Sequence, residues 1–143
     1  MEPLYRLVYT SFRSNNCGPD DLKDILRSCR VNNVSNGITG VLIHSEFRFL
    51  QYLEGTHDNV VKLFEKIKQD PRHHTVGRRN FEAIDKRIFP SWAMAYKDLS
   101  DEKVAYDTSN SSEYEKSLED LLNGKLNFDD EAIKILQLFF KTI

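Results

Sequence analysis

The alternation of hydrophobic and polar residues near the start of the chain is typical of a strand. In residues 4–9 (LYRLVY), Tyr5, Leu7 and Tyr9 fall on one face by the two-residue period of a strand, and Ser11 continues that face. The pattern therefore predicts a strand that turns Tyr9 and Ser11 toward the interior.

A helical period replaces this alternation after the turn and helix-start signal of residues 18–20 (GPD). The same helix face comes round again at Asn32 and Asn33, and the pair Asn36-Gly37 is a stop signal. The pattern predicts a helix that carries two amides at the end of its apolar stripe. That stripe consists of Leu22, Ile25, Leu26 and Cys29.

Two strands and a second helix are predicted next. Residues 38–44 (ITGVLIH) are typical of a buried strand, and residues 47–54 (FRFLQYLE) of a second strand with Gln51 on one face. Residues 56–58 can cap the helix, which ends at Asp70 because a residue before proline is pushed out of helical geometry. Asp70 lies on the side of the inner stripe formed by Val60, Leu63, Phe64 and Ile67.

The remaining pattern predicts two more strands and two C-terminal helices. Residues 80–86 and 91–96 complete an expected β-α-β-β-α-β-β order, which indicates an α+β, ferredoxin-like sheet with an added strand and two helices on one face. After the polar residues 107–113, helices are expected over 114–122 and 130–140. We expect them to cover the open face of the sheet, since a bare apolar face would be a liability.

Composition narrows the function classes. The chain has 143 residues, enough for one compact domain with a short extension, and its net charge of −2 carries no electrostatic footprint for nucleic acid or an anionic membrane. Cys17 and Cys29 have no metal-ligand spacing and suit a reducing compartment. No apolar run approaches the roughly 20 residues of a membrane span. These features predict a soluble, cytoplasmic protein.

Motifs for catalysis are not visible in the sequence. There is no hydrolytic triad, no Walker loop and no metal cluster, so neither an enzyme nor a metal protein is expected. The pair His73-His74 lacks partners at ligand spacing and is interpreted as a solvated pair at a helix end. His44 and His57 are interpreted as surface residues.

A set of polar residues is nevertheless predicted to point inward. Other interpretations stay open: Tyr9 as a core tyrosine, Asn33 as a helix C-cap, Gln51 on a solvent-facing edge strand and Asp70 as a helix-end carboxylate. Buried polar groups cost about 1–3 kcal/mol each if unpaired, so several around one cavity suggest a polar, planar ligand such as a heterocycle. The set consists of Tyr9, Ser11, Asn32, Asn33, Gln51 and Asp70, with Ile25 and Ile67 as apolar walls.

Many dispersed motifs occur in a fixed order over residues 4–97. They are LYRLVYTS, the pair NN, G-I-T-G, F-L-Q-x-L-E-G, D-x-R-H and W-x-M. With these motifs the chain resembles the BLUF family, sensors of blue light using flavin adenine dinucleotide (FAD).

The resemblance implies specific roles for the polar set. Tyr9 would donate an electron and a proton to the excited flavin, and Gln51 would lie between Tyr9 and the ring edge. Asn33 would hold the polar edge of the ring, with Asn32 near its pyrimidine end.

Further roles follow from the same resemblance. The flavin ring would lie between Ile25 and Ile67, while Asp70 and Arg72 would approach its ribityl and phosphate side. The residues that would neighbour Gln51 and respond to its state are Ser11, Trp92 and Met94.

The resemblance also implies a photocycle without a chemical product. The electron and proton return to Tyr9 while the Gln51 amide changes orientation or tautomer, which strengthens a hydrogen bond to the flavin and shifts absorption to the red. Residues 1–97 would form the photosensor and residues 98–143 a helical extension. The expected output runs through the last strand and the C-terminal helices to a separate signalling partner, with a homo-oligomer expected and no nucleic acid or membrane.

Three other functions compete with this one. A ferredoxin-like interaction adaptor would purify colourless, whereas a flavoprotein would be yellow. An RNA-binding sheet is disfavoured by the acidic balance and the missing aromatic-basic stripe. An acyl-phosphate hydrolase would need a phosphate-cradling loop, and none is visible in the sequence.

Overall fold

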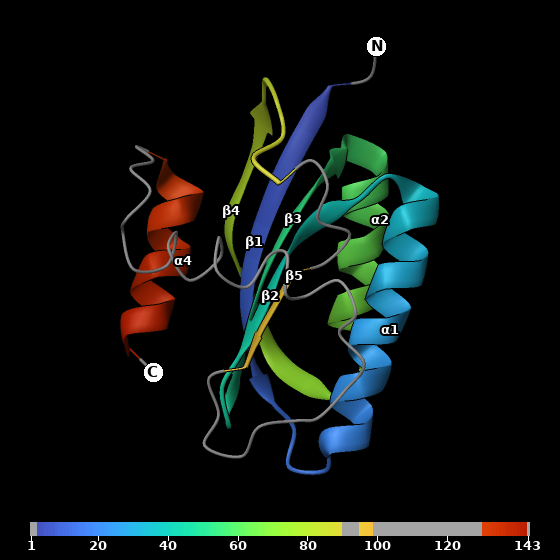
Figure 1. The fold of residues 1–143 in the computed structure, drawn as a ribbon, viewed down its shortest axis with the longest axis vertical. Helices are drawn as coiled ribbons and strands as arrows, with labels where there is room; N and C mark the ends of the chain where they lie inside the picture. Colours follow the sequence, from blue (N-terminus) through green and yellow to red (C-terminus); the bar gives the residue numbers. More distant parts are fainter. Residues whose placement is uncertain (1–2, 90–94, 99–129, 143) are drawn as a thin grey trace.

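The computed structural model describes residues 3–89, 95–98 and 130–142. A five-stranded sheet lies between two layers of helices: α1 and α2 cover one face, and α4 covers the other (Figure 1). The elements are β1 (Leu4–Arg13), α1 (Pro19–Asn36), β2 (Thr39–His44), β3 (Arg48–Thr56), α2 (His57–Lys68), β4 (His73–Ile84), β5 (Ala95–Asp98) and α4 (Glu131–Thr142).

The strand order, β4-β1-β3-β2-β5, confirms the ferredoxin-like prediction with one added strand. The first four strands are antiparallel to their neighbours, and β5 adds parallel to β2. Each of the two β-α-β crossovers skips one strand, so β1 and β3 become the central pair. Gln51 therefore lies on a central strand, which rules out the interpretation that it faces solvent on an edge.

Strand lengths differ from the sequence prediction at the edge of the sheet. β4 begins at His73 and not at residue 80, because its pairing with β1 continues through Phe12↔His74 and Arg13↔His73. β1 likewise runs on to Arg13. Residues 73 and 74, interpreted as a helix end, are thus part of a strand.

Local signals place both helices as the sequence predicts. Pro19 opens α1, and the Asp21 carboxylate accepts the Gly18 N–H at 2.9 Å. The helix ends at Gly37, whose φ of 64° is the left-handed geometry that glycine adopts without strain. Thr56 is the extended residue before α2.

The core is split by the sheet into two sides. Leu26, Leu42 and Leu53 pack between the sheet and α1, while Tyr52 and Leu136 pack between the sheet and α4. The prediction that a C-terminal helix covers the open face is confirmed for residues 131–142. The helix expected over 114–122, as well as Trp92 and Met94, lies outside the described residues.

His44 is fully buried, which corrects its interpretation as a surface residue. Its strand, β2, has a neighbour on both sides, and its ring lies 6.1 Å from that of Phe49. The side chain of His57 is 45% exposed, as predicted. Within residues 3–89, 95–98 and 130–142, no helix is long and apolar enough to cross a membrane.

Candidate functional site

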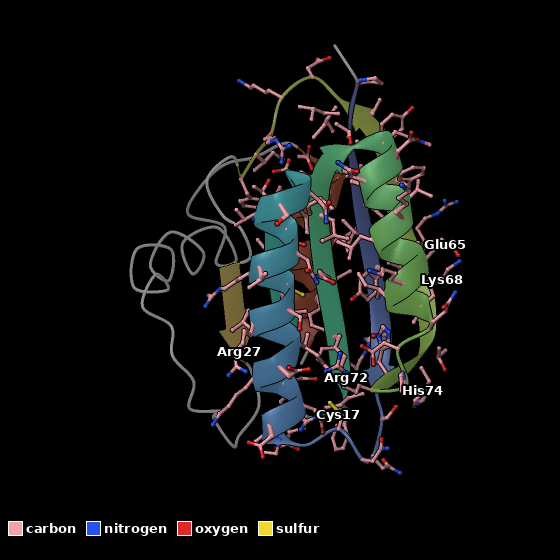
Figure 2. All side chains as sticks on the ribbon, turned by 90° about the vertical axis from the view of Figure 1, so that its right-hand side faces the viewer. Cys17, Arg27, Glu65, Lys68, Arg72 and His74 are labelled. Atoms are coloured by element: carbon pink, nitrogen blue, oxygen red, sulfur yellow. The ribbon has the colours of Figure 1, made fainter. Side chains whose placement is uncertain are left out.

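A cavity of about 670 Å³ lies between α1 and α2 above the central strands, a volume typical of small-molecule sites. Figure 2 looks onto this side of the molecule, with Arg72 between the two helices and Glu65 and Lys68 on the outer side of α2. The polar side chains that line the cavity are Tyr9, Ser28, Asn32, Asn33, Asn36, Gln51, Asn59, Lys62, Lys66, Asp70, Arg72 and His73.

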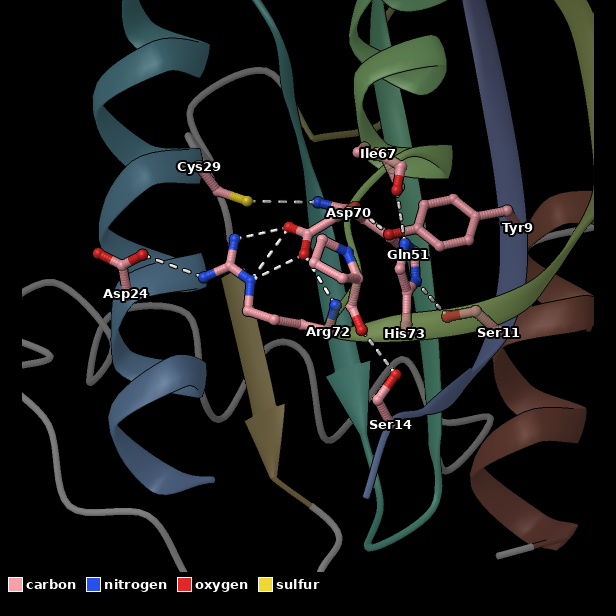
Figure 3. Close-up of polar contacts among 11 residues, drawn as sticks. Tyr9, Ser11, Ser14, Asp24, Cys29, Gln51, Ile67, Asp70, Arg72 and His73 are labelled. Atoms are coloured by element: carbon pink, nitrogen blue, oxygen red, sulfur yellow. Dashed lines mark hydrogen bonds and ion pairs between the residues drawn. The ribbon is translucent and has the colours of Figure 1, made fainter. Parts of the chain in front are cut away.

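The floor of the cavity holds a buried hydrogen bond between a phenol and an amide. Tyr9 and Gln51 are cross-strand partners in β1 and β3, and the Tyr9 hydroxyl donates to Gln51 Oε1 at 2.7 Å (Figure 3). Burial raises the pKa of Tyr9 well above its ordinary value, so the phenol keeps its proton and remains the donor.

The other end of the Gln51 amide points across the cavity toward α1. Gln51 Nε2 lies 3.8 Å from Cys29 Sγ, and burial raises the pKa of that thiol to about 11. The thiol is therefore neutral at pH 7 and offers only a weak acceptor. Gln51 thus presents an oxygen to Tyr9 and an NH₂ group to the cavity.

The two asparagines of α1 are placed differently. Asn33 is 1% exposed and lines the cavity, whereas Asn32 is exposed and reaches the cavity at its mouth. Successive residues of a helix are rotated by about 100°, so only one of two neighbours can face the core. The expectation that both point inward is correct for Asn33 and wrong for Asn32.

Asp70 and Arg72 form an ion pair that ties the end of α2 to α1. Arg72 Nη2 lies 2.6 Å from Asp70 Oδ2, and Arg72 Nη1 lies 3.0 Å from Asp24 of α1 (Figure 3). The hydrogen bond from Arg72 lowers the pKa of Asp70, so this carboxylate is ionised at neutral pH. Both residues line the cavity.

His73 corrects the interpretation of the histidine pair as solvated. It is half-buried and lines the cavity, with Nδ1 2.7 Å from Ser11 Oγ and Nε2 2.5 Å from the Ile67 carbonyl oxygen. His74 is exposed, as expected. The alternation of faces along a strand separates the two rings once both residues belong to β4.

Apolar side chains form the walls of the cavity. Ile25 of α1 and Ile67 of α2 both line it, as the sequence predicts. The sequence interpretation missed the residues at the mouth, although Asn59, Lys62 and Lys66 follow the helical period beside the apolar stripe of α2.

These groups fit a planar heterocycle with polar edges. Two apolar walls can enclose its faces, amides from α1 and β3 can bond its edge, and the cations at the mouth suit an anionic tail. Within the described residues, no group of three or more His, Cys, Asp and Glu side chains could hold a metal ion.

Comparison with known proteins gives a consistent result. The family model described as "Sensors of blue-light using FAD" (BLUF) matches residues 4–95. The beta subunit of a photoactivated adenylate cyclase from Euglena gracilis is 37% identical over 92 residues, which are 64% of this chain and 11% of the cyclase subunit. The chain thus spans about a tenth of that relative.

Two solved structures are also similar. The dark-state structure of BlrB, a BLUF protein, has 26% sequence identity and a TM-score of 0.70, and the match covers 100% of this chain and 99% of BlrB. Klebsiella pneumoniae BlrP1 with FMN and cyclic diGMP has 28% identity and a TM-score of 0.74, with 96% of this chain and 34% of BlrP1 covered.

Proposed function

The chain belongs to the BLUF family of blue-light sensors that bind flavin, and on this premise we propose that the Tyr9–Gln51 pair is its photoactive switch. The observation that carries the proposal is the buried bond from the Tyr9 hydroxyl to Gln51 Oε1, with the opposite end of the same amide facing the cavity. An amide placed in this way can exchange its donor and acceptor ends between two neighbours.

The cavity residues suggest how the flavin is held. Ile25 and Ile67 would lie against the two faces of the ring, and Asn33 and Gln51 would bond its polar edge. Asn32 would contact it from the mouth. Asp70 and Arg72 would lie toward the ribityl and phosphate side.

The Tyr9–Gln51 pair can support a light-driven transfer of an electron and a proton. When bound, flavin supplies absorption of blue light and, once excited, an acceptor strong enough to take an electron from a phenol. Tyr9 gives up that electron and passes its proton to Gln51 Oε1, 2.7 Å away; both later return to Tyr9. Because burial keeps Tyr9 protonated in the dark, its proton leaves only when the electron does.

The lasting change is in Gln51. Once its amide has reversed orientation or tautomer, the group that faces the cavity is different, and the hydrogen bonding around it is rearranged. Trp92 and Met94 are predicted to respond to this change, and they lie outside the described residues. No product forms, so we propose that the chain is a sensor and not an enzyme.

Absorption spectra of the purified chain before and after blue light test the function. We expect a yellow protein whose flavin band shifts to the red on illumination and returns in the dark. A colourless protein would support the interaction-adaptor alternative. A flavin spectrum that light leaves unchanged would contradict the switch.

We further propose that the output reaches a separate partner through α4. The relatives' names join this type of sensor to adenylate cyclases, and α4 exposes Leu138 while it packs on the sheet through Ile133 and Leu136. Hydrogen exchange on the same light and dark samples should show a change in the protection of residues 130–142. Equal protection would count against this route.

A homo-oligomer in the cytoplasm remains a prediction from the sequence.

The mouth of the cavity favours FAD over a flavin without phosphates. Lys62 and Lys66 lie one helical turn apart on α2 and line the cavity, beside the hydrogen bond from Asn59 Nδ2 to the Asn36 carbonyl oxygen at 2.9 Å. A lysine is a point charge suited to phosphate, and FAD carries two phosphates where riboflavin carries none.

Removal of the two lysines should therefore weaken FAD binding selectively. We expect Lys62→Ala with Lys66→Ala to raise the Kd for FAD about tenfold, as the loss of two exposed charge contacts implies, and to leave the Kd for riboflavin unchanged. Titration of the apoprotein with each flavin measures this. Lys68→Ala is the control, because Lys68 pairs with Glu65 at 2.9 Å on the outer side of α2. An equal loss for both flavins would contradict the assignment.

A further inference from the structure

A bulge in β4 determines which of two adjacent histidines faces the cavity. Thr10 pairs with Gly77 and Phe12 with His74, so Ser11 faces two residues of β4. Thr75 lies in this bulge with a φ of 54°, a left-handed conformation that is strained for a β-branched residue.

An unbulged register would have reversed the two histidines. Continued pairing from Thr10↔Gly77 would set Arg13 opposite His74, and opposite residues share a face of the sheet. The bulge sets Arg13 opposite His73 instead. His73 therefore lies on the face of Tyr9 and Ser11, at the cost of a strained residue beside the site.

The contacts of His73 determine its tautomer. Nε2 lies 2.5 Å from the Ile67 carbonyl oxygen, which can only accept, so Nε2 must carry the proton. In the neutral ring Nδ1 is then an acceptor, and the Ser11 hydroxyl, 2.7 Å away, must donate to it. With its proton engaged, Ser11 can only accept bonds from its remaining neighbours.

The Ser11 hydroxyl oxygen is near enough to Gln51 to accept a hydrogen bond from its amide. It is 1% exposed, lies two residues after Tyr9 on the same face, and pairs with Phe49, so Gln51 is its diagonal neighbour across β1 and β3. Long side chains reach diagonal neighbours in an antiparallel pair. In the reversed orientation, the Gln51 NH₂ group takes the place of Oε1, which faces Tyr9 on the strand that also carries Ser11.

We propose that His73 is a positioning residue of the photoactive pair. By holding the Ser11 hydroxyl as an acceptor, it stabilises the reversed Gln51 amide and so prolongs the light state. His73 also packs edge-on against the Tyr9 ring, with centroids 6.0 Å apart. The inference deepens the proposed function, on which it rests.

The dark-recovery rate of the absorption shift tests the proposal. His73→Gln can keep a donor near the Ile67 carbonyl but removes the acceptor for Ser11, whereas His73→Asn can keep an acceptor near the position of Nδ1. We expect Ser11→Ala and His73→Gln each to recover about fivefold faster, as the loss of one buried hydrogen bond implies. The double variant should be no faster than either, and His73→Asn should recover within about twofold of the wild type.

Two controls separate positioning from simple packing. His74→Gln alters the neighbouring, exposed histidine and should leave recovery unchanged. Thr75→Gly should keep the bulge without the strain and recover like the wild type. Equal effects of His73→Asn and His73→Gln, additive rates in the double variant, or unchanged recovery in Ser11→Ala would overturn the proposal.

Failure of the His73 proposal can be distinguished from failure of the Tyr9–Gln51 switch. A wild-type chain with no red-shifted state would overturn the Tyr9–Gln51 switch, and this proposal with it. A normal wild-type photocycle with unaffected variants would overturn the role of His73 alone. If the His73 variants do not fold, Ser11→Ala still tests the proposal. Faster recovery of this variant would support it, and unchanged recovery would overturn it.

Discussion

Tyr9→Phe is expected to bind flavin as the wild-type chain does and to show no red-shifted state after blue light. The substitution keeps the ring, which packs 5.7 Å from that of Phe64, and removes only the hydroxyl that donates to Gln51. Phenylalanine has no proton to give and is far harder to oxidise than a phenol. Absorption spectra before and after illumination measure the result, and a normal photocycle would reject Tyr9 as the donor.

Two further variants, one a control and one a second test of the switch, accompany Tyr9→Phe. Tyr5→Phe changes a half-buried tyrosine on the same face of β1, where its ring contacts His57 and Phe81, and should leave the photocycle intact. Gln51→Ala should abolish the shift as Tyr9→Phe does, because it removes the amide that can be reversed. A shift that persists without Gln51 would place the switch elsewhere.

Gly40→Ala is expected to have the largest effect on folding. A Cβ at this position of β2 would lie 1.8 Å from the Tyr52 carbonyl oxygen and 2.9 Å from its carbon, both of them backbone atoms of the neighbouring strand. β2 and β3 would have to separate beside Tyr52, at a cost of about 3 kcal/mol, the upper end of what overpacking typically costs. We expect a much lower free energy of unfolding than in the wild type, measured by thermal or urea unfolding.

Gly77→Ala is the matched control for this clash. Gly77 lies in β4, and a Cβ there would meet no atom within 4 Å. Alanine restricts the unfolded chain more than glycine does, so this variant should be unchanged or more stable by up to about 1 kcal/mol. Equal destabilisation by the two substitutions would show that the close approach at Gly40 is not the cause.

The sequence predicts the ends of a helix or strand correctly where a local signal marks them. The Gly18-Pro19 start and the Gly37 stop of α1 appear in the structure at the predicted positions, because they depend on backbone chemistry within a few residues. β4 lacked such a signal. In its first half, His73, His74, Gly77 and Arg78 pair with β1, and this long-range pairing has no counterpart in a local pattern.

By itself, the sequence determined the order of the elements, the faces on which Tyr9, Ser11 and Gln51 lie, and the apolar walls at Ile25 and Ile67. These features follow from strand and helix periods, which depend only on neighbouring residues. The tertiary structure alone decided that Asn32 lies at the mouth, that His44 is buried, and that His73 and not His74 meets Ser11. Each of these depends on which strand or helix packs alongside, and a one-residue bulge is enough to exchange the two faces of a strand.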